Sequence, residues 1–531
     1  MPARTSSKSI RELLDHLDAG ELVLPEIQRE FVWSRKAVMF LFDSLYRGLP
    51  IGHMLVWKAR ETFKTRRYAH VTRGRAQSRD NFYGYLLDGQ QRLTAISFVK
   101  DGHDDYRLLL NLWSDIDKYP DYGDPFYWFG SWAEGDPWIV TVAEVLQDKF
   151  DPLAYLARLR QDEEYKEVYE KTAYDRLIKL QKILDYQIGI TEFESESYAE
   201  ATELFIRFNS MGRKLNKSDL AVAQLALKVP GLTSDEMTKD IKGWEPAFRF
   251  TRPFLIQCLA AVHTERMSVK EPARMWQDAG DSDIRNAWKK TARAISEVVE
   301  FLTGTVRWDS AVWLPSFNAL IPLIVIAANG GSLNKADRER ARAWLILASL
   351  RSYFSGSVYT QLDRVLKKLG NKPSVGKLWN NTRKRLGRVK PEDFETNRLS
   401  GPAMALFVSM IRNVDARDWQ RHTPLTGTVL GHNAKLQVHH FFPRALLRRE
   451  KVAATDIDNF ANYSILSKGT NLHLATEEPA TYLKRERIDN RELDKQCIPT
   501  DPDLWRVGRY QDFLTARRRL LAQRANEFLG L

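Results

Sequence analysis

Two adjacent histidines at the end of a short apolar run constrain the fold of this chain more than any other feature. Residues 434–438 can form a strand that leads into His439 and His440. Pro443 cannot continue a central strand, so the chain must turn there. Residues 462–466 are apolar enough for a second strand, and a turn and a helical segment can follow. The sequence therefore predicts a strand, turn, strand and helix with histidine at the end of the first strand.

This outline is that of a ββα-metal finger, and its residue types suit phosphodiester hydrolysis. The reaction needs a base of near-neutral pKa to take a proton from water. It also needs a divalent cation to offset charge on the phosphate and the leaving oxygen. One histidine can be the base, its neighbour and an amide oxygen can hold the ion, and an asparagine can fix the imidazole tautomer. Because Mg²⁺ takes few protein ligands and keeps waters, a sparse ligand set is sufficient. The alternative is a histidine pair that only packs at a strand end.

Residues 438–443, then Asn462 with its apolar strand, then Asn471 resemble the HNH-type nuclease domain of GmrSD-type modification-dependent (type IV) restriction enzymes. The resemblance implies that His440 is the general base and that Asn462 orients it. It also implies that His439 and Asn471 hold Mg²⁺ or Mn²⁺. The last position is Asn where the HNH pattern has His, a departure that concerns the metal site and not the base.

Composition indicates a globular protein with several domains and an anionic partner. The length of 531 residues suits about three domains, and a net charge of +12 favours a polyanion. Two cysteines, Cys258 and Cys497, are too few for a disulfide framework or a zinc cluster. The N-terminus lacks an apolar signal core, and the run at 319–328 is too short to cross a bilayer. We therefore expect a bacterial cytoplasmic protein with no membrane partner.

A second motif lies where a predicted strand, residues 83–87, meets a helix that begins after Gly89. Backbone N–H groups at a helix N-terminus attract phosphate, and Arg92 in the first turn adds positive charge and paired donors. Most such junctions only turn the chain, so the junction alone does not define a phosphate site.

Three N-terminal segments together resemble a ParB/sulfiredoxin-like domain with an Asp-Gly-Gln-Gln-Arg motif, which precedes the nuclease in GmrSD-type proteins. They are Leu-Pro-Glu-Ile-Gln-Arg-Glu-Phe-Val-Trp at 24–33, Asp-Gly-Gln-Gln-Arg-Leu-Thr at 88–94 and Phe-Ile-Arg-Phe-Asn-Ser-Met-Gly at 205–212. The resemblance implies binding, and usually hydrolysis, of a nucleoside triphosphate, with GTP, UTP, ATP and CTP left open. It implies that Arg92 and the Gly89 turn hold phosphates, while other residues place metal or water and line or close the cleft. The residues assigned to the nucleotide site in this way are Gln28, Arg29, Asp88, Gly89, Gln90, Gln91, Arg92, Arg207 and Asn209.

Helical periodicity and its breaks divide the chain into three predicted domains. The predicted domains are 1–230, 231–398, which is an all-α linking bundle, and 399–531. The resemblance implies that the first is an α+β ParB/sulfiredoxin-like sensor that binds and hydrolyses nucleotide, and that the last is a ββα-metal (HNH) nuclease domain. Residues 104–140 are dense in aromatic side chains. They predict either a satellite core under an insertion or a pocket for a modified or flipped base.

Basic residues cluster at two places in the second half of the chain. The far end of the bundle, residues 367–390, is either a solvated face or a DNA track. Around the finger, basic residues are expected to position backbone phosphates, which orient DNA without reading its sequence. The full basic set comprises Arg444, Arg448, Arg449 and Lys451, then Lys484, Arg485 and Arg487, and then Arg517, Arg518, Arg519 and Arg524 on the last helix.

The expectation is therefore a nucleotide-regulated, divalent-metal-dependent DNA endonuclease that restricts foreign, modified phage DNA. Its partners would be double-stranded DNA and a nucleoside triphosphate, with a homo-oligomer left open. One alternative is a DNA-modification-sensing NTPase or binding protein whose finger is structural. Another is an NTPase or nucleotidyl-transfer enzyme whose finger only holds substrate. The modification that is sensed, and whether nucleotide activates or inhibits cleavage, also stay open.

Overall fold

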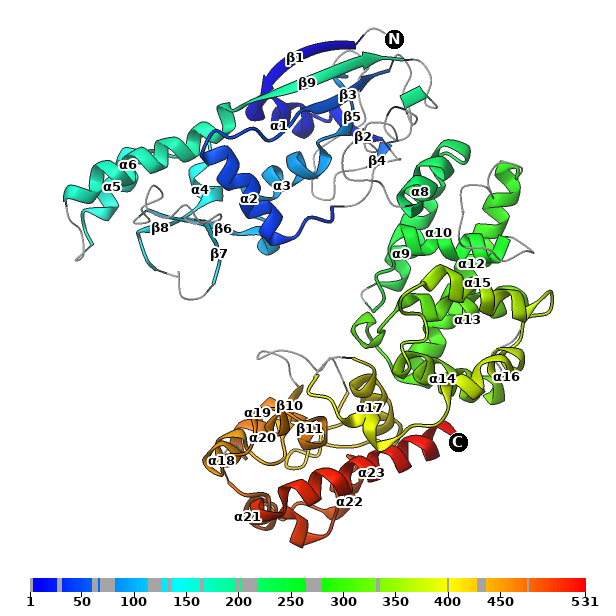
Figure 1. Cartoon of the computed structure of the whole chain (residues 1–531). Helices are drawn as coiled ribbons and strands as arrows, with labels where there is room; N and C mark the ends of the chain where they lie inside the picture. The colour runs from blue at the N-terminus through cyan, green and yellow to red at the C-terminus, as the bar shows by residue number, and fades with distance from the viewer. Residues whose placement is uncertain are drawn as a thin grey trace. The chain divides into compact units, whose positions relative to one another are not determined.

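The structure is a computed structural model, and it shows two compact units, residues 1–234 and 235–531. Figure 1 shows the elements of both units. The described residues are 3–25, 31–59, 65–66, 82–112, 126–130, 135–162, 167–195, 200–201, 204, 217–245, 247–263, 279–330, 335–398, 401–426, 436–474 and 477–531.

The first unit is built on a mixed six-stranded sheet with the strand order β1-β9-β3-β5-β2-β4. Strand β3 pairs parallel with β9 and antiparallel with β5, and β5 pairs parallel with β2. The two outer pairs, β1 with β9 and β2 with β4, are antiparallel. The strands are β1 Ala3–Ser9, β2 Leu22–Pro25, β3 Met54–Lys58, β4 Thr65–Arg66, β5 Gly84–Asp88 and β9 Gln187–Glu194.

Helices pack on both faces of this sheet. Alternate side chains of a strand point to opposite faces, and here both sets are buried. One core joins Val56 and Leu86 to the helices α1 to α6. On the other face, Trp57 and Tyr85 pack with helix α8. A capping box, which the spacing of Ser9 and Glu12 favours, is present at the start of α1, where the Ser9 hydroxyl accepts from the Glu12 N–H. The helices are α1 Ile10–Asp18, α2 Arg35–Tyr46, α3 Gln90–Lys100, α4 Val142–Val145, α5 Pro152–Leu159, α6 Glu167–Gln181 and α8 Lys217–Lys228.

The described part of the aromatic-rich segment forms a small three-stranded sheet, β7-β6-β8, which extends the same core. Phe126 and Trp138 are buried in that core, and Tyr106 and Trp128 pack against it. These four side chains therefore pack into the main core of the first unit and not into a separate satellite core. Trp113, Tyr119, Tyr122 and Trp132 lie outside the described residues. The strands are β6 Leu108–Asn111, β7 Phe126–Trp128 and β8 Ile139–Thr141.

The second unit begins with a helical bundle, in which every element described between residues 237 and 413 is helical. Helix α12 packs on α10 and α13, and α14 packs on α16 and α17. No helix among the described residues has both the length and the apolar character that a bilayer crossing requires. The main helices are α9 Met237–Trp244, α10 Arg252–His263, α12 Asp281–Phe301, α13 Ile321–Ala328, α14 Lys335–Leu350, α15 Val358–Leu369, α16 Val375–Leu386 and α17 Pro402–Asn413.

The same unit ends in a two-stranded finger followed by helices. Strands β10 and β11 pair antiparallel, with Leu436 opposite Ser467 and His440 opposite Tyr463. Helix α20 follows β11 directly, which is the expected order of elements, and β10 runs through both histidines. Two short helices that were not predicted lie between the strands. The elements are β10 Leu436–His440, α18 Arg444–Arg449, α19 Ala454–Ile457, β11 Tyr463–Ser467, α20 Lys468–His473, α21 Pro479–Arg485, α22 Asn490–Lys495 and α23 Tyr510–Leu529.

The last helix, α23, joins the finger to the bundle within this unit. Near its start the Phe513 ring stacks on Phe441 with centroids 4.9 Å apart, directly beneath the histidine strand. Near its end the Asn526 amide donates to the Val389 carbonyl at 2.9 Å. One rigid element therefore contacts both the finger core and the segment that follows α16.

Candidate active site

The two histidines of β10 have different environments because successive residues of a strand point to opposite sides. The His439 side chain is buried, at 2% exposure, beside the rings of Trp419 and Tyr482. The His440 side chain is 19% exposed and stays within reach of solvent. Of the two, His440 alone can meet water directly, as the predicted general base must.

A carboxylate that the sequence did not reveal holds the His440 ring. Asp458 Oδ1 lies 2.9 Å from His440 Nε2, and Asp458 Oδ2 accepts from Arg444 Nη2 at 3.0 Å. Burial lowers the pKa of His440, and the hydrogen bond and charge of Asp458 oppose that shift. The available signal was an aspartate four residues before Asn462, on the turn that leads into the facing strand.

Asn462 is fully buried, and its hydrogen bonds go to the backbone and not to the His440 ring. Its Oδ1 accepts from the Phe442 N–H at 2.8 Å, and its Nδ2 donates to the carbonyls of Phe442 and Ile457 at 3.1 and 3.2 Å. The side chain thus fixes the chain two residues beyond the histidine. The predicted contact between Asn462 and the imidazole is replaced by Asp458, and Asn462 can orient His440 only through the backbone.

The other predicted pair, His439 and Asn471, is in contact. His439 Nδ1 lies 2.9 Å from Asn471 Oδ1, and Asn471 Nδ2 donates to Gln437 Oε1 at 2.9 Å. Since the amide oxygen accepts, the proton of the neutral ring lies on Nδ1. The buried Nε2 has no hydrogen-bond partner among the residues that the structure describes. Burial lowers the pKa of His439 to about 4, so the ring is neutral near pH 7.

The donors of this pair fit a hard divalent ion with few protein ligands. A neutral imidazole and an amide oxygen are both ligand types, and binding at Nδ1 would release its proton. Their 2.9 Å separation matches that of neighbouring ligands at about 2.1 Å from an octahedral ion. Across the described ranges, three or more His, Cys, Asp or Glu side chains do not gather in a cluster that could hold a metal. A metal at the finger would therefore have the sparse ligand set that the sequence predicts.

A buried aspartate fixes the helix that carries Asn471. Asp418 Oδ1 accepts from the Thr470 hydroxyl at 2.6 Å, and its Oδ2 accepts from the Ser467 N–H at 2.7 Å. Burial raises the pKa of Asp418, but these hydrogen bonds outweigh it, so the carboxyl stays acidic. The start of α20 is thereby tied to the segment before β10.

Arg517 is a correction to the expected DNA contacts. It is fully buried, and its guanidinium donates to four backbone carbonyls, including those of Ala461 and Tyr463 on either side of Asn462. Burial lowers its pKa to about 10. Two neighbours on α23 are engaged by carboxylates: Arg518 by Glu395, and Arg524 by Asp494 and Glu527.

The three arginines predicted to contact DNA near the finger lie on α18 and are exposed. Arg444 is paired with Asp458, and Arg449 lies 3.6 Å from Glu450. Their contact with phosphate stays a prediction.

In the first unit, the Asp88–Arg92 motif ties its own helix to a neighbouring loop. Arg92 Nη2 contacts Asp88 at 2.8 Å and the His53 carbonyl at 2.7 Å, and Nη1 donates to the Ile51 carbonyl at 2.6 Å. Gly89 has a φ of +96°, and a Cβ there would lie 2.6 Å from Met54 Cγ, so only glycine fits.

The other residues assigned to nucleotide binding have mixed outcomes. Gln90 and Gln91 are buried in the first turn of α3, and Gln91 Oε1 accepts from the Val32 N–H. Gln28, Arg29, Arg207 and Asn209 lie outside the described residues. The motif residues are thus brought together, and phosphate binding by them stays a prediction.

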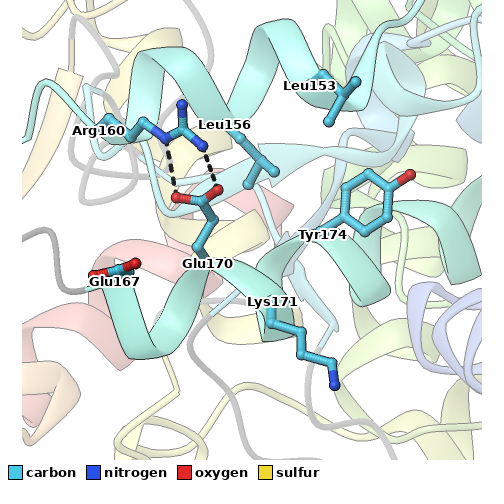
Figure 2. A pocket seen from close by; sticks show the side chains of 7 residues that line it. All are labelled: Leu153, Leu156, Arg160, Glu167, Glu170, Lys171 and Tyr174. Carbon is cyan, nitrogen blue, oxygen red and sulfur yellow. Dashed lines mark hydrogen bonds and ion pairs between the residues drawn. The ribbon is translucent and has the colours of Figure 1, made fainter.

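A groove of about 580 Å³ lies elsewhere in the first unit, between α5 and α6. Figure 2 shows the Arg160 guanidinium and the Glu170 carboxylate joined across it. Neither functional motif contributes to its lining, so it is separate from both candidate sites.

These features define an α+β unit with a glycine-turn arginine motif and a second, helical unit that carries a histidine finger. Residues 10–226 match the family model described as GmrSD restriction endonuclease, N-terminal domain. The match extends from α1 into α8 and confirms the predicted similarity of this part of the chain to the N-terminal domain of GmrSD-type restriction enzymes. The chain is also 20% identical to the uncharacterized protein MJ0686 of Methanocaldococcus jannaschii over 529 residues, covering 90% of this chain and 86% of that protein.

Proposed function

We propose that this protein is a divalent-metal-dependent DNA endonuclease regulated by a nucleotide and directed at modified foreign DNA. The observation that carries the proposal is the environment of His440. Its ring is partly exposed on β10, at 19%, and is held at Nε2 by Asp458, while its chain neighbour His439 contacts Asn471. The match of residues 10–226 to a restriction-endonuclease domain supports DNA as the substrate.

The residues of the finger would divide the work as follows. Neutral His440 carries its proton on Nε2, which donates a hydrogen bond to Asp458, and keeps a lone pair on Nδ1 that can take a proton from water. The Asp458 carboxylate would then stabilise the imidazolium that forms. An Mg²⁺ or Mn²⁺ ion held by His439 and Asn471 would offset charge on the phosphate. Arg444, Arg448 and Arg449 are exposed beside the finger and would contact the DNA backbone.

The main alternative is a finger with a purely structural role. The environment of His439 is compatible with that alternative, whereas the environment of His440 argues against it. His439 is buried and packed, as a structural histidine would be. His440 combines solvent exposure with a carboxylate partner, an arrangement typical of a catalytic base. This contrast favours the nuclease over a binding protein with an inert finger.

The first unit would act as the nucleotide sensor. Arg92 already uses its guanidinium on Asp88 and on two carbonyls of the loop 51–53. The guanidinium has five N–H donors and these contacts use three of them, so a phosphate can engage Arg92 through the other two. Because the phosphate would compete with the loop carbonyls for the positive charge, nucleotide binding would shift that loop. Moving a gate from 1:99 to 99:1 needs about 5.5 kcal/mol of differential binding, which a triphosphate can supply.

A cleavage assay tests the proposal. Modified and unmodified phage DNA would be incubated with the full chain, with Mg²⁺ or Mn²⁺, and with or without each of the four triphosphates. The expected result is cleavage that EDTA abolishes and that one nucleotide changes in rate. Absence of cleavage under every combination, with nucleotide turnover present, would instead favour the sensing NTPase with a structural finger.

A further inference from the structure

The positive charge of this chain is concentrated in one short segment of the second unit. Residues 358–390 contain ten lysines and arginines and one aspartate, so they carry nine of the chain's net +12 charges. The aspartate, Asp363, is buried at 7% exposure and leaves the surface without a carboxylate from this segment. The segment forms helices α15 and α16, which pack against each other and are called here the basic hairpin.

The cations of the basic hairpin point away from its core because of the helical period. The buried positions are Leu362, Val365, Leu366 and Leu369 on α15 and Val375, Leu378, Thr382 and Leu386 on α16. The lysines and arginines occupy the remaining, exposed positions. Two contacts close the connection between the helices: Lys377 Nζ donates to the Lys372 carbonyl at 2.8 Å, and Asn381 Nδ2 donates to the Lys368 carbonyl at 3.3 Å.

Several of these side chains have no partner. Among the cations of this described segment, those that make no side-chain hydrogen bond, ion pair or ring contact with another described residue include Lys367, Lys368, Lys372, Arg383 and Lys384. Elsewhere in the unit, surface arginines such as Arg285 and Arg524 are paired with carboxylates. Unpaired like charges on one hairpin repel one another, and a bound polyanion relieves that repulsion.

We propose that the basic hairpin binds the phosphate backbone of duplex DNA outside the cleavage site. The inference rests on the proposed function for the identity of the polyanion. The hairpin is connected to the finger through α23, whose Asn526 bonds to Val389 just beyond α16. From Phe513, under the finger, to Asn526 the helix rises about 20 Å, the length of about six base pairs. A duplex that extends at least about six base pairs beyond the finger is therefore long enough to reach the hairpin.

The test is the salt dependence of DNA binding by a fourfold variant, Lys367→Gln, Lys368→Gln, Arg383→Gln and Lys384→Gln. Affinity for a 30-base-pair duplex would be measured by fluorescence anisotropy in EDTA, so that no DNA is cut, between 50 and 200 mM salt. The slope of log K against log salt should fall by about 0.9 for each substituted side chain that contacts phosphate, up to about 3.6. The double variant with only Lys367→Gln and Lys368→Gln should lose a smaller part of the slope, and thermal melting checks that both are folded.

The matched control removes the same charge from exposed lysines of the first unit: Lys36, Lys149, Lys171 and Lys182. Its slope should equal that of the parent chain. A fourfold hairpin variant with the parent's slope would overturn the proposal, as would an equal loss in the control. Cleavage of the same duplex with Mg²⁺ is measured separately. A reduced slope in the fourfold variant, together with no cleavage by the parent chain, would support DNA binding by the hairpin and reject the nuclease. Cleavage by the parent chain, together with an unchanged slope in the fourfold variant, would support the nuclease and reject DNA binding by the hairpin.

Discussion

The role of Asp458 gives the sharpest prediction, because the cleavage rates of two Asp458 variants should follow an order that a purely structural role does not produce. Asp458 accepts a hydrogen bond from His440 Nε2 at 2.9 Å, which keeps the proton on Nε2 and leaves the lone pair on Nδ1. In Asp458→Asn, the amide can donate to Nε2 and so favour the tautomer with its proton on Nδ1. That tautomer cannot act as a base at the open nitrogen. Asp458→Ala removes the carboxylate but leaves both tautomers available.

The size of each effect follows from the contacts that are lost. A hydrogen bond to a charged group is worth about 1.5–3 kcal/mol, so losing the stabilised imidazolium in Asp458→Ala should slow cleavage about 10- to 150-fold. Asp458→Asn adds the wrong tautomer, and a loss of about 10³- to 10⁴-fold is expected, as found when the aspartate of a Ser-His-Asp triad becomes Asn. The predicted order of rates is therefore parent, then Ala, then Asn.

Single-turnover cleavage of plasmid DNA with saturating Mg²⁺ or Mn²⁺ measures this order. Asn preserves the shape of Asp, so a packing role alone would make Asp458→Asn the milder variant. Thermal melting of both variants checks that neither is unfolded. If Asp458→Asn cut DNA within threefold of the parent rate, the assignment of Asp458 to the base would be refuted.

Three further predictions concern the scaffold of the site. Asn462→Asp keeps the acceptor for the Phe442 N–H but loses both donated bonds, so it should destabilise the chain by about 2–4 kcal/mol; a midpoint in urea equal to the parent's would contradict this. In metal-free buffer, His439 has a folded pKa of about 4 against 6.5 unfolded. The contribution of neutral His439 to the free energy of unfolding is therefore complete above pH 6.5 and is lost as the pH falls toward 4. The free energy of unfolding should drop about 2.5 kcal/mol more between pH 7 and pH 4.5 in the parent than in His439→Gln; equal drops would show that the buried ring does not govern acid sensitivity. Arg517→Ala should lower the free energy of unfolding by about 3–5 kcal/mol, because four carbonyls lose their donor. Exposed Arg519→Ala should change the free energy of unfolding by no more than about 0.5 kcal/mol; similar melting curves for the two variants would show that the buried Arg517 contacts do not stabilise the finger.

Local chemistry made part of this structure predictable. The capping box at Ser9 and Glu12 depends on residues three apart, and it is present. The turn at Gly89 was expected from one glycine between a strand and a helix, and its φ of +96° shows why glycine is required there. The pairing of His439 with Asn471 followed from the motif, since the two lie on neighbouring elements of one finger.

Contacts set by the folded backbone were harder to predict. Asp458 reaches His440 across a loop whose two helices the sequence did not indicate. Arg517 was misread because it stands in a run of three arginines. Its spacing of four residues from Phe513 and from Leu521 places it on their buried face of α23. That spacing was visible in the sequence, but no sequence pattern indicates the four backbone carbonyls that accept hydrogen bonds from the buried guanidinium.

The most direct test of the account is DNA cleavage by His440→Ala, with His473→Ala as the control. His473 is a more exposed histidine of the same domain that pairs with Glu486. Loss of a general base costs about 10²- to 10⁴-fold in rate, so His440→Ala should leave almost no cleavage while nucleotide turnover persists. His473→Ala should cut as the parent does. Cleavage by His440→Ala at the parent rate, in a chain that melts normally, would contradict the account.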